Sequence, residues 1–171
     1  LSRSALAAYQ LQKVRETLSL IRKKSPFYRR HLAHCPPELA SLDALEQFPF
    51  TTADDLRQQP YHFLCVPQRA ISRVVTLNTS GTTGAPKRIF QTAEDQELTL
   101  DFFHVGMSTF VSPGERVLIL LPGERSGSVG DLLATALARL GAVGLKHGPV
   151  RDVAEAVGRL KAEEVHCIVG A

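Results

Sequence analysis

Hydrophobic residues recur at intervals of three and four near the beginning of the chain, with charged residues between them. This spacing predicts an amphipathic helix whose hydrophobic positions are Leu11, Val14, Leu18 and Ile21. Pro26 stands at a helix-start position and Pro36 opens a proline pair, so a second short helix is expected between them. Two further short helices are expected at residues 42–47 and 52–59. Residues 1–70 are therefore predicted to form a helical region.

The pattern changes from helical to extended at Ile71. The segment ISRVVTLN is rich in β-branched residues and KRIFQT continues an extended pattern, which predicts strands before and after a polar loop. Thr92 then stands at an N-cap position, ahead of a predicted long helix. Leu98, Phe102 and Val105 fall on one face of that helix. Beside them lie Phe103, Met107 and Phe110.

The last third of the chain alternates between predicted strands and helices. RVLILL is a continuous hydrophobic run, typical of a strand buried on both faces of a parallel sheet. Ser128 with Asp131, and Asp152 with Glu155, are predicted to cap the two helices that follow. The strands AVGLK and VHCIVG come after these helices. This order predicts an α/β fold with crossovers of a mostly parallel sheet over residues 71–171, in a single domain that also includes residues 1–70.

Composition excludes some classes of protein and leaves others open. The chain has 171 residues, of which 44% are hydrophobic, which is enough for one compact core. Its formal charge of +3 is too small and too dispersed to indicate a nucleic-acid surface. Three widely spaced cysteines argue against a secreted disulfide framework. Without a signal sequence or a hydrophobic run long enough to span a membrane, the protein is expected to be cytoplasmic.

The candidate chemistry lies in the segment TLNTSGTTGAPK, where hydroxyls, glycines and a lysine gather. Gly81 and Gly84 permit close backbone approach, and Lys87 adds a positive charge, so the natural ligand is a polyphosphate. A Walker loop is excluded because Arg88 follows Lys87 where that motif needs Ser or Thr. The glycines of GERSGSVG miss the spacing of the dinucleotide-binding fingerprint. From composition alone, an ordinary polar hairpin that binds nothing stays an open alternative.

The order of residues in TSGTTGAPK resembles the phosphate-binding motif of the adenylate-forming enzymes, a superfamily of acyl-CoA synthetases, luciferases and peptide-synthetase adenylation domains. Every position of that motif matches. The segments SPFYRRHL, FPFTTADDLR and RIFQT around it look like the phenylacetate-CoA ligase branch, which includes coenzyme F390 synthetase-like proteins. The resemblance is strong over residues 25–111 and weak beyond. It implies the N-terminal part of the large domain of such an AMP-forming ligase.

The resemblance also implies a reaction and its participants. In this family a carboxylate attacks the α-phosphorus of MgATP to give an acyl-adenylate and pyrophosphate, and a thiol such as coenzyme A then takes the acyl group. The phosphate-binding role carries to Thr79, Ser80, Gly81, Thr82, Thr83, Gly84 and Lys87. Thr83 and Lys87 are the catalytic candidates, because they would neutralise charge on the departing pyrophosphate.

The second glycine cluster aligns loosely with a segment that lines the acyl pocket in this family. The residues that would border substrate are Ser126, Gly127, Ser128 and Gly130. The alternative interpretation is a strand-to-helix turn in which Ser128 serves only as an N-cap.

The sequence stops before the family's adenine-binding, ribose-binding and magnesium-binding residues, so the magnesium ligand is expected outside this chain and no turnover is expected from the chain alone. The other hypothesis is a naturally short, noncatalytic nucleotide-binding or interaction module. The strand VHCIVG is expected to present an unpaired sheet edge through which the chain self-associates.

Several histidines and cysteines lie close enough together in the sequence to suggest a zinc site. His31, His34 and Cys35 are close in sequence, and His62 lies three residues before Cys65. Their spacings match none of the usual zinc motifs, so no metal site is predicted. Cys167 is interpreted as a small buried residue, His104 as a packed helix residue, and His147 as part of a strand-exit turn.

Overall fold

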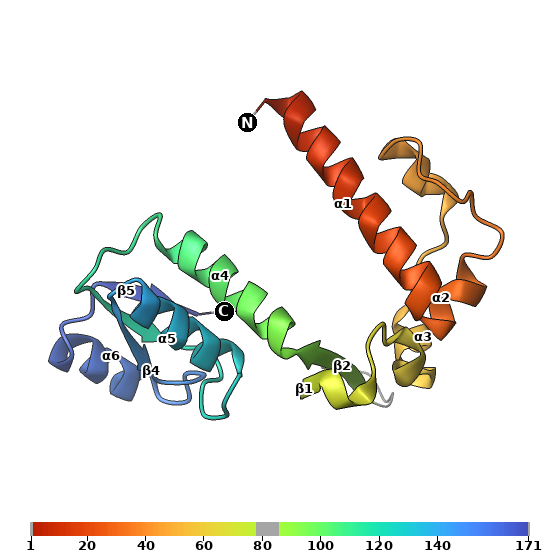
Figure 1. Ribbon diagram of the computed structural model, residues 1–171. Helices are drawn as coiled ribbons and strands as arrows, with labels where there is room; N and C mark the ends of the chain where they lie inside the picture. The colour runs from red at the N-terminus through yellow and green to blue at the C-terminus, as the bar shows by residue number, and fades with distance from the viewer. Residues whose placement is uncertain (1, 78–85, 171) are drawn as a thin grey trace. The chain divides into compact units, whose positions relative to one another are not determined.

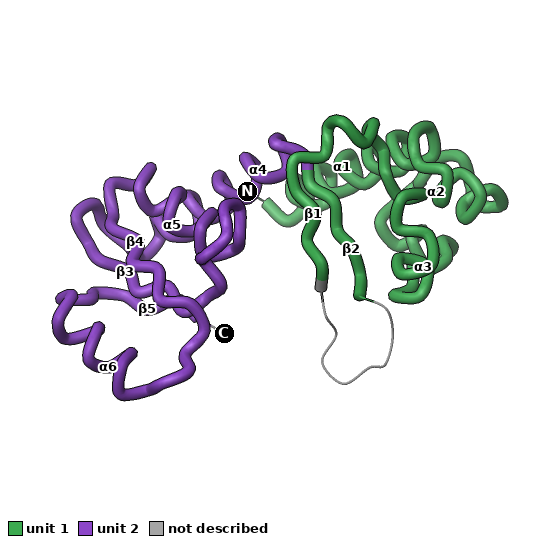
Figure 2. The backbone as a smooth tube through the Cα atoms, turned by 90° about the horizontal axis from the view of Figure 1, so that it is seen from below, with its two compact units in different colours: residues 1–91 green, residues 92–171 purple. Residues whose placement is uncertain are grey.

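The computed structural model describes residues 2–77 and 86–170, and it divides the chain into two compact units. The units are Leu1–Gln91 and Thr92–Ala171 (Figure 2). Secondary structure changes from helices to strands at Ile71, where the sequence predicts this change, so the first unit contains both the helical region and a two-stranded sheet. No described helix is long and hydrophobic enough to cross a membrane.

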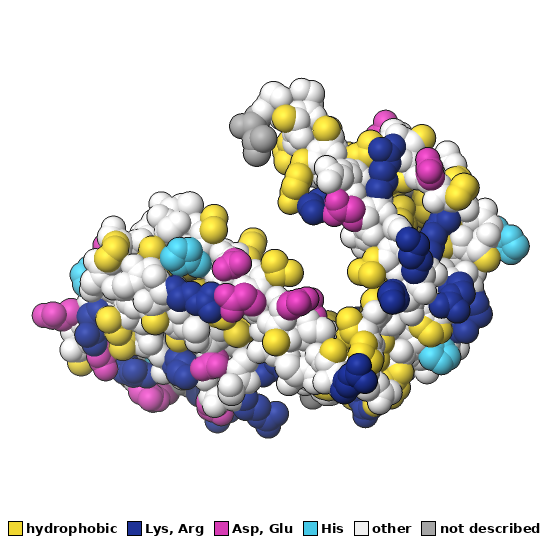
Figure 3. Space-filling view, viewed as in Figure 1, with side chains coloured by type: hydrophobic (Ala, Val, Ile, Leu, Met, Phe, Trp, Pro, Cys, Tyr) yellow, Lys and Arg dark blue, Asp and Glu magenta, His cyan; other side chains and the backbone are white. Residues whose placement is uncertain are grey.

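The first unit is built from helices and short 3₁₀ turns, followed by a strand pair (Figure 1). Its elements are α1 (Arg3–Lys24), α2 (Pro26–His31), η1 (Asp43–Gln47), α3 (Ala53–Gln58), η2 (Pro60–Phe63), η3 (Gln68–Ala70), β1 (Ile71–Leu77) and β2 (Lys87–Thr92). Lys and Arg side chains gather over α1 and α2 (Figure 3).

The predicted hydrophobic face of α1 is confirmed, and the helix extends beyond the residues that form this face. The four predicted hydrophobic positions are half-buried, whereas most of the other α1 residues are exposed. The helix begins after Ser2, whose side chain accepts a hydrogen bond from the Ala5 amide, and ends at Ser25. Ser25 also caps α2, where Pro26 occupies the first turn as predicted.

The second unit is a parallel sheet between helices (Figures 1 and 2). Its elements are α4 (Ala93–Met107), β3 (Arg116–Ile119), α5 (Val129–Arg139), β4 (Val143–Lys146), α6 (Val153–Ala162) and β5 (Cys167–Val169). The strand order is β4-β3-β5, and both pairs are parallel, which confirms the sequence prediction. The sheet lies between α5 and α6 in Figure 2, and α4 packs on α5.

The core of the second unit lies where β3 meets α5. Val117 and Ile119 are fully buried and face Leu133 and Leu137 of α5. Strand β4 comes so close to α5 that a Cβ atom on Gly144 would lie 2.8 Å from the Cα atom of Ala134. Cys167 packs against this core but is only half-buried, whereas the sequence predicts a buried residue.

Helix α4 presents its hydrophobic residues on two sides. Leu98, Phe102 and Val105 share a face, as the spacing predicts, but they are 67%, 74% and 65% exposed in the described chain. The side that packs inward carries instead Leu100, Phe103 and Met107. Phe110, beyond the helix, is also exposed. Periodicity alone cannot choose between two hydrophobic stripes, because the choice is made by where α5 lies.

Candidate functional site

The candidate phosphate loop is carried by the β1–β2 strand pair of the first unit. Ser72 Oγ, near the start of β1, donates a hydrogen bond of 3.1 Å to the Gln91 carbonyl, near the end of β2. The two ends of the pair are therefore held together, and the connection between the strands lies at the opposite end. Lys87 opens β2 and is half-buried. The other six predicted phosphate ligands, residues 79–84, lie outside the described residues.

An aromatic contact supports strand β2 from the helical part of the first unit. The rings of Tyr61 in η2 and Phe90 in β2 have centroids 5.2 Å apart. The neighbouring Phe63 stacks on Phe27 of α2 at 4.1 Å. Ser25, fully buried, donates a hydrogen bond of 2.8 Å from its Oγ to the His62 carbonyl. Contacts therefore run without a break from α2 through η2 to the strand that begins with Lys87.

The second glycine cluster follows β3 at the carboxyl edge of the parallel sheet. Gly127 has a φ of 69°, which favours glycine, and its amide donates to Asp131 Oδ2 at 2.8 Å. The Gly130 amide donates to the Pro122 carbonyl at 2.8 Å. A Cβ atom on Gly130 would lie 2.8 Å from the Leu121 carbonyl oxygen and 2.9 Å from that of Pro122. Both glycines thus shape the turn that leads into α5.

Ser128 stands at the N-cap position of α5, but the predicted capping box is wrong. Its side chain makes no capping hydrogen bond, and Asp131 bonds to the amide of Gly127 rather than to that of Ser128. Ser128 is only 8% exposed, and its Oγ is buried without a hydrogen-bond partner among the described residues. A buried hydroxyl without a partner is unusual in a folded protein. Ser126 is exposed.

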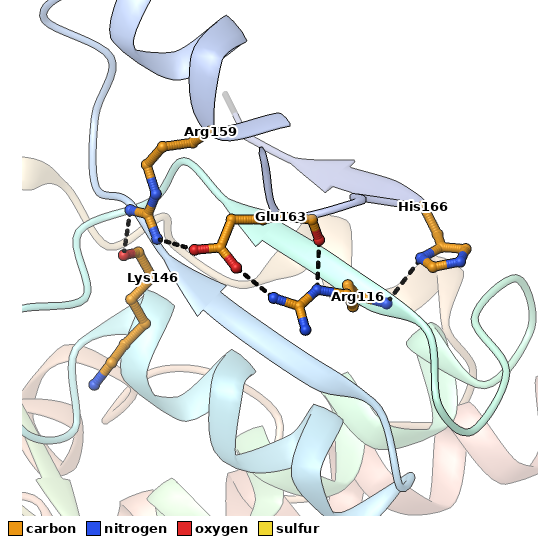
Figure 4. A network of polar contacts seen from close by, with 5 residues as sticks. All are labelled: Arg116, Lys146, Arg159, Glu163 and His166. Carbon is orange, nitrogen blue, oxygen red and sulfur yellow. Dashed lines mark hydrogen bonds and ion pairs between the residues drawn. The ribbon is translucent and has the colours of Figure 1, made fainter. Parts of the chain in front are cut away.

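A chain of polar contacts links this turn to the far end of the sheet. Asp131 Oδ1 forms an ion pair with Lys146 Nζ at 3.0 Å. Figure 4 shows the continuation, in which Arg159 donates to the Lys146 carbonyl at 3.2 Å and lies 3.9 Å from the Glu163 carboxylate. Glu163 is in turn ion-paired with Arg116 at the start of β3. The network connects β3, β4 and α6 with the turn before α5.

His147 lies at the same edge of the sheet, directly after β4. Its backbone amide donates to the Ile119 carbonyl at 2.9 Å, and its Nδ1 atom lies 3.1 Å from the Gly148 carbonyl oxygen. Its Nε2 atom is buried without a partner in the described part of the chain. The turn after β3 lies close to the end of β4, since a Cβ atom on Gly123 would lie 3.2 Å from the Lys146 side chain. Ligands of open α/β sheets bind at this carboxyl edge.

The histidines and cysteines weighed as a zinc site do not come together as one. The described residues hold no group of three His, Cys, Asp or Glu side chains that is arranged for a metal ion. His31 Nε2 lies 3.1 Å from the Phe50 carbonyl oxygen, and His62 Nδ1 lies 2.6 Å from Gln59 Oε1. Burial raises the pKa of the Cys65 thiol, which favours its protonated and less reactive form.

Two curated relatives are similar to this chain in sequence, at moderate identity. The phenylacetate-coenzyme A ligase of Pseudomonas putida is 38% identical over 95 residues, which make up 53% of this chain and 21% of that protein. The enzyme of the same name from Thermus thermophilus is 30% identical over 125 residues, 71% of this chain and 27% of that protein. This similarity supports a fragment of the adenylate-forming superfamily. The chain spans about a quarter of the length of these curated relatives.

Solved structures agree with this assignment at the level of the fold. A 2-hydroxyisobutyryl-CoA ligase, solved in an open conformation with 2-HIB-AMP and CoA, has a TM-score of 0.81 over the whole of this chain and 41% of its own. The same enzyme in its thioesterification state has a TM-score of 0.80 over 38% of its length. At 20% and 23% identity these likenesses show an adenylate-forming fold. No family model matches the chain.

Proposed function

We propose that this chain is the phosphate-binding part of an ATP-dependent, AMP-forming carboxylic acid ligase that forms an acyl-adenylate and then a thioester with coenzyme A. The observation that carries the proposal is the complete motif TSGTTGAPK at the connection of the β1–β2 pair, in a chain related to phenylacetate-CoA ligases. The solved ligases of this fold are bound to an acyl-AMP and to CoA, which supports the same two ligand classes here.

Electrostatics explains what the loop would do. Negative charge accumulates on the β- and γ-phosphates as pyrophosphate departs, and hydroxyl and amide donors of the loop stabilise that charge together with the Lys87 ammonium. Charge-assisted hydrogen bonds contribute about 1.5–3 kcal/mol each, so three or four of them hold a triphosphate after desolvation. The Tyr61–Phe90 contact supports β2 and so keeps the backbone of Lys87 in place while pyrophosphate departs.

The loop hypothesis is tested by ATP–pyrophosphate exchange in the complete ligase that contains this sequence. A Thr83→Ala/Lys87→Ala variant is expected to lose exchange by a factor of about 100 or more, because it removes two interactions that strengthen in the transition state. Arg88→Ala is the matched control, since Arg88 is the next cation along the strand and is exposed. Equal nucleotide affinity and equal exchange in the double variant and the wild type would contradict the hypothesis.

The second part of the proposal concerns the carboxylic acid substrate. Ser126, Gly127, Ser128 and Gly130 border the substrate in this interpretation, at the carboxyl edge of the sheet. Its support is the buried hydroxyl of Ser128, which lacks a partner among the described residues. Ser128→Ala is expected to raise KM for the carboxylic acid and to leave KM for ATP unchanged. Unchanged KM for both would support the alternative of an ordinary N-cap.

The chain alone is predicted to catalyse no exchange, because the family's adenine-, ribose- and magnesium-binding residues and its adenylating lysine are expected outside it. Carboxylate-dependent exchange by the 171-residue chain would overturn this prediction. The alternative function is a short noncatalytic nucleotide-binding or interaction module. It predicts that the encoding reading frame contains no further ligase segment and that its product still binds nucleotide.

Four narrower expectations stay predictions. Self-association is expected through β5, which lies at an edge of the described sheet, and a strictly monomeric chain in light scattering would contradict it. Kinship with coenzyme F390 synthetase-like proteins and a cytoplasmic location are proposed on the sequence alone. Aryl acetates are the substrates that the family suggests, and a panel of carboxylic acids tests this suggestion in the complete ligase.

A further inference from the structure

The positive charge of the chain is concentrated in its first 37 residues. This segment contains eight Lys and Arg residues and one acidic residue, a formal charge of +7. The remaining 134 residues contain 12 Lys and Arg against 16 Asp and Glu. The small total of +3 therefore hides a strong asymmetry, which indicates an acidic ligand for the α1–α2 region. Figure 3 shows these Lys and Arg side chains over α1 and α2.

Part of this charge lines a cavity. A cavity of about 580 Å³ lies between α1 and the segment of residues 37–39. Helix α1 contributes residues at positions 15, 18, 19, 22 and 23, a spacing that places all of them on one face. Three of these residues are cations, Arg15, Arg22 and Lys23, whereas the opposite wall has a single carboxylate, Glu38. The volume falls in the range of small-molecule sites.

The two arginines are held in place before any ligand arrives. Arg15 donates from Nε to the Leu39 carbonyl at 2.7 Å and from Nη2 to the Ala40 carbonyl at 3.1 Å. Arg22 donates from Nη2 to the Pro36 carbonyl at 2.6 Å. The guanidinium of Arg22 also lies 5.9 Å from the centre of the Phe48 ring. Such anchors fix the direction of each guanidinium, so little side-chain entropy is lost on binding.

Donors remain after these anchors are counted. A guanidinium has five N–H donors, and each arginine uses one or two of them on the protein. The Lys23 ammonium has no ion-pair partner in the described part of the chain. Uncompensated cations around a cavity match an oxyanion with several charges.

We propose that the cavity between α1 and residues 37–39 is a second anion site, which binds a small molecule carrying phosphate or pyrophosphate groups. The arginines grip phosphate oxygens with fixed donors, and Lys23 adds a charge that adjusts its position. Ser19, on the same wall, supplies a hydroxyl. The proposal stands apart from the proposed function, because it uses no residue of the loop at 79–87.

The sharpest test compares two neighbouring lysines of α1. Lys23 lines the cavity, whereas Lys24 lies about 100° further round the helix, does not line the cavity and is also exposed. Lys23→Gln is expected to weaken binding of inorganic pyrophosphate about fivefold, and Lys24→Gln less than twofold, in calorimetric titrations at low salt. Glu38→Gln is expected to strengthen binding two- to fivefold, because Glu38 is the carboxylate that the described residues contribute to the cavity.

All three variants are made in the Thr83→Ala/Lys87→Ala background, so that the contribution of the loop to binding is reduced. Backbone amide signals of Ser19 and Leu39 are expected to shift during the titration, which locates the site. Coenzyme A is titrated in parallel with pyrophosphate. Tighter binding of coenzyme A assigns the site to a phosphorylated cosubstrate, and equal binding assigns it to the phosphate group alone.

Equal losses in Lys23→Gln and Lys24→Gln would overturn the proposal, since they would indicate general attraction by a basic helix. Unmoved Ser19 and Leu39 signals, or no binding of either ligand, would overturn it as well. These outcomes leave the loop hypothesis untouched, because that hypothesis is tested by exchange through Thr83 and Lys87.

Discussion

Replacing Gly130 with alanine tests the geometry of the turn before α5. The added Cβ atom would lie 2.8 and 2.9 Å from two backbone carbonyl oxygens and 3.1 Å from the Cα atom of Gly123. Backbone atoms cannot swing aside as the end of a flexible side chain does, so the turn itself must open. The 2.8 Å hydrogen bond from the Gly130 amide to the Pro122 carbonyl is then weakened.

The magnitude follows from these contacts. Overpacking costs about 1–3 kcal/mol, and a weakened hydrogen bond costs up to about 1 kcal/mol. Alanine returns about 0.5–1 kcal/mol relative to glycine in a helix. The net loss in free energy of unfolding is therefore about 1–3 kcal/mol. With a urea m-value of about 1.5 kcal/mol/M, the midpoint of unfolding falls by about 1–2 M.

The assay is urea unfolding followed by circular dichroism, with Gly158→Ala as the matched control. Gly158 lies in the interior of α6, and among the described residues no atom beyond its neighbours and the helix backbone lies within 4 Å of an added Cβ, so alanine there is expected to stabilise the chain by about 0.5–1 kcal/mol. If Gly130→Ala unfolded at the wild-type midpoint or above it while Gly158→Ala was stabilised, the close approach described for the turn would be refuted.

Three further predictions concern side-chain contacts. Hydrogen bonding from Arg139 lowers the pKa of Glu97 in the folded chain. The pair therefore stabilises the fold at pH values above the unfolded pKa of Glu97, and this stabilisation is lost as the pH falls through the folded pKa. Arg139→Gln is expected to flatten the dependence of the urea midpoint on pH between about 3 and 5. Glu163→Gln removes the ion pair with Arg116, both side chains being about one-third exposed, and is expected to cost about 1 kcal/mol in urea unfolding, so an unchanged midpoint would contradict it. The raised pKa of Cys65 predicts that iodoacetamide at pH 8 alkylates this thiol more slowly in the folded chain than in urea, which peptide mass spectrometry measures.

Local signals in the sequence predicted the elements that depend on local chemistry. The N-cap at Thr92, the proline at the start of α2 and the parallel strands each follow from residues close together in the sequence. The box at Ser128 failed because its acid bonds instead to the preceding residue, Gly127, whose positive φ turns its amide toward the carboxylate. Such a backbone turn is a three-dimensional property that residue types do not reveal.

Prediction of the site was limited for a different reason. The order of residues in the loop motif predicts a phosphate ligand, whereas no sequence motif marks the cavity lined by α1. Its arginines are separated by seven positions, and the carboxylate opposite them comes from a proline-rich turn after α2. The uneven distribution of charge was readable from the sequence, although the total of +3 concealed it.

The outward stripe of α4 has a consequence for how this chain tolerates variation. Leu98, Phe102 and Val105 are already surrounded mostly by water, so polar residues there cost the folded chain little. Leu100, Phe103 and Met107 have no such freedom, because their replacement opens the core. Evolutionary constraint on Leu98, Phe102 and Val105 would therefore indicate contacts with something other than this chain. A mutational scan for stability would separate such constraint from the constraint that core packing places on Leu100, Phe103 and Met107.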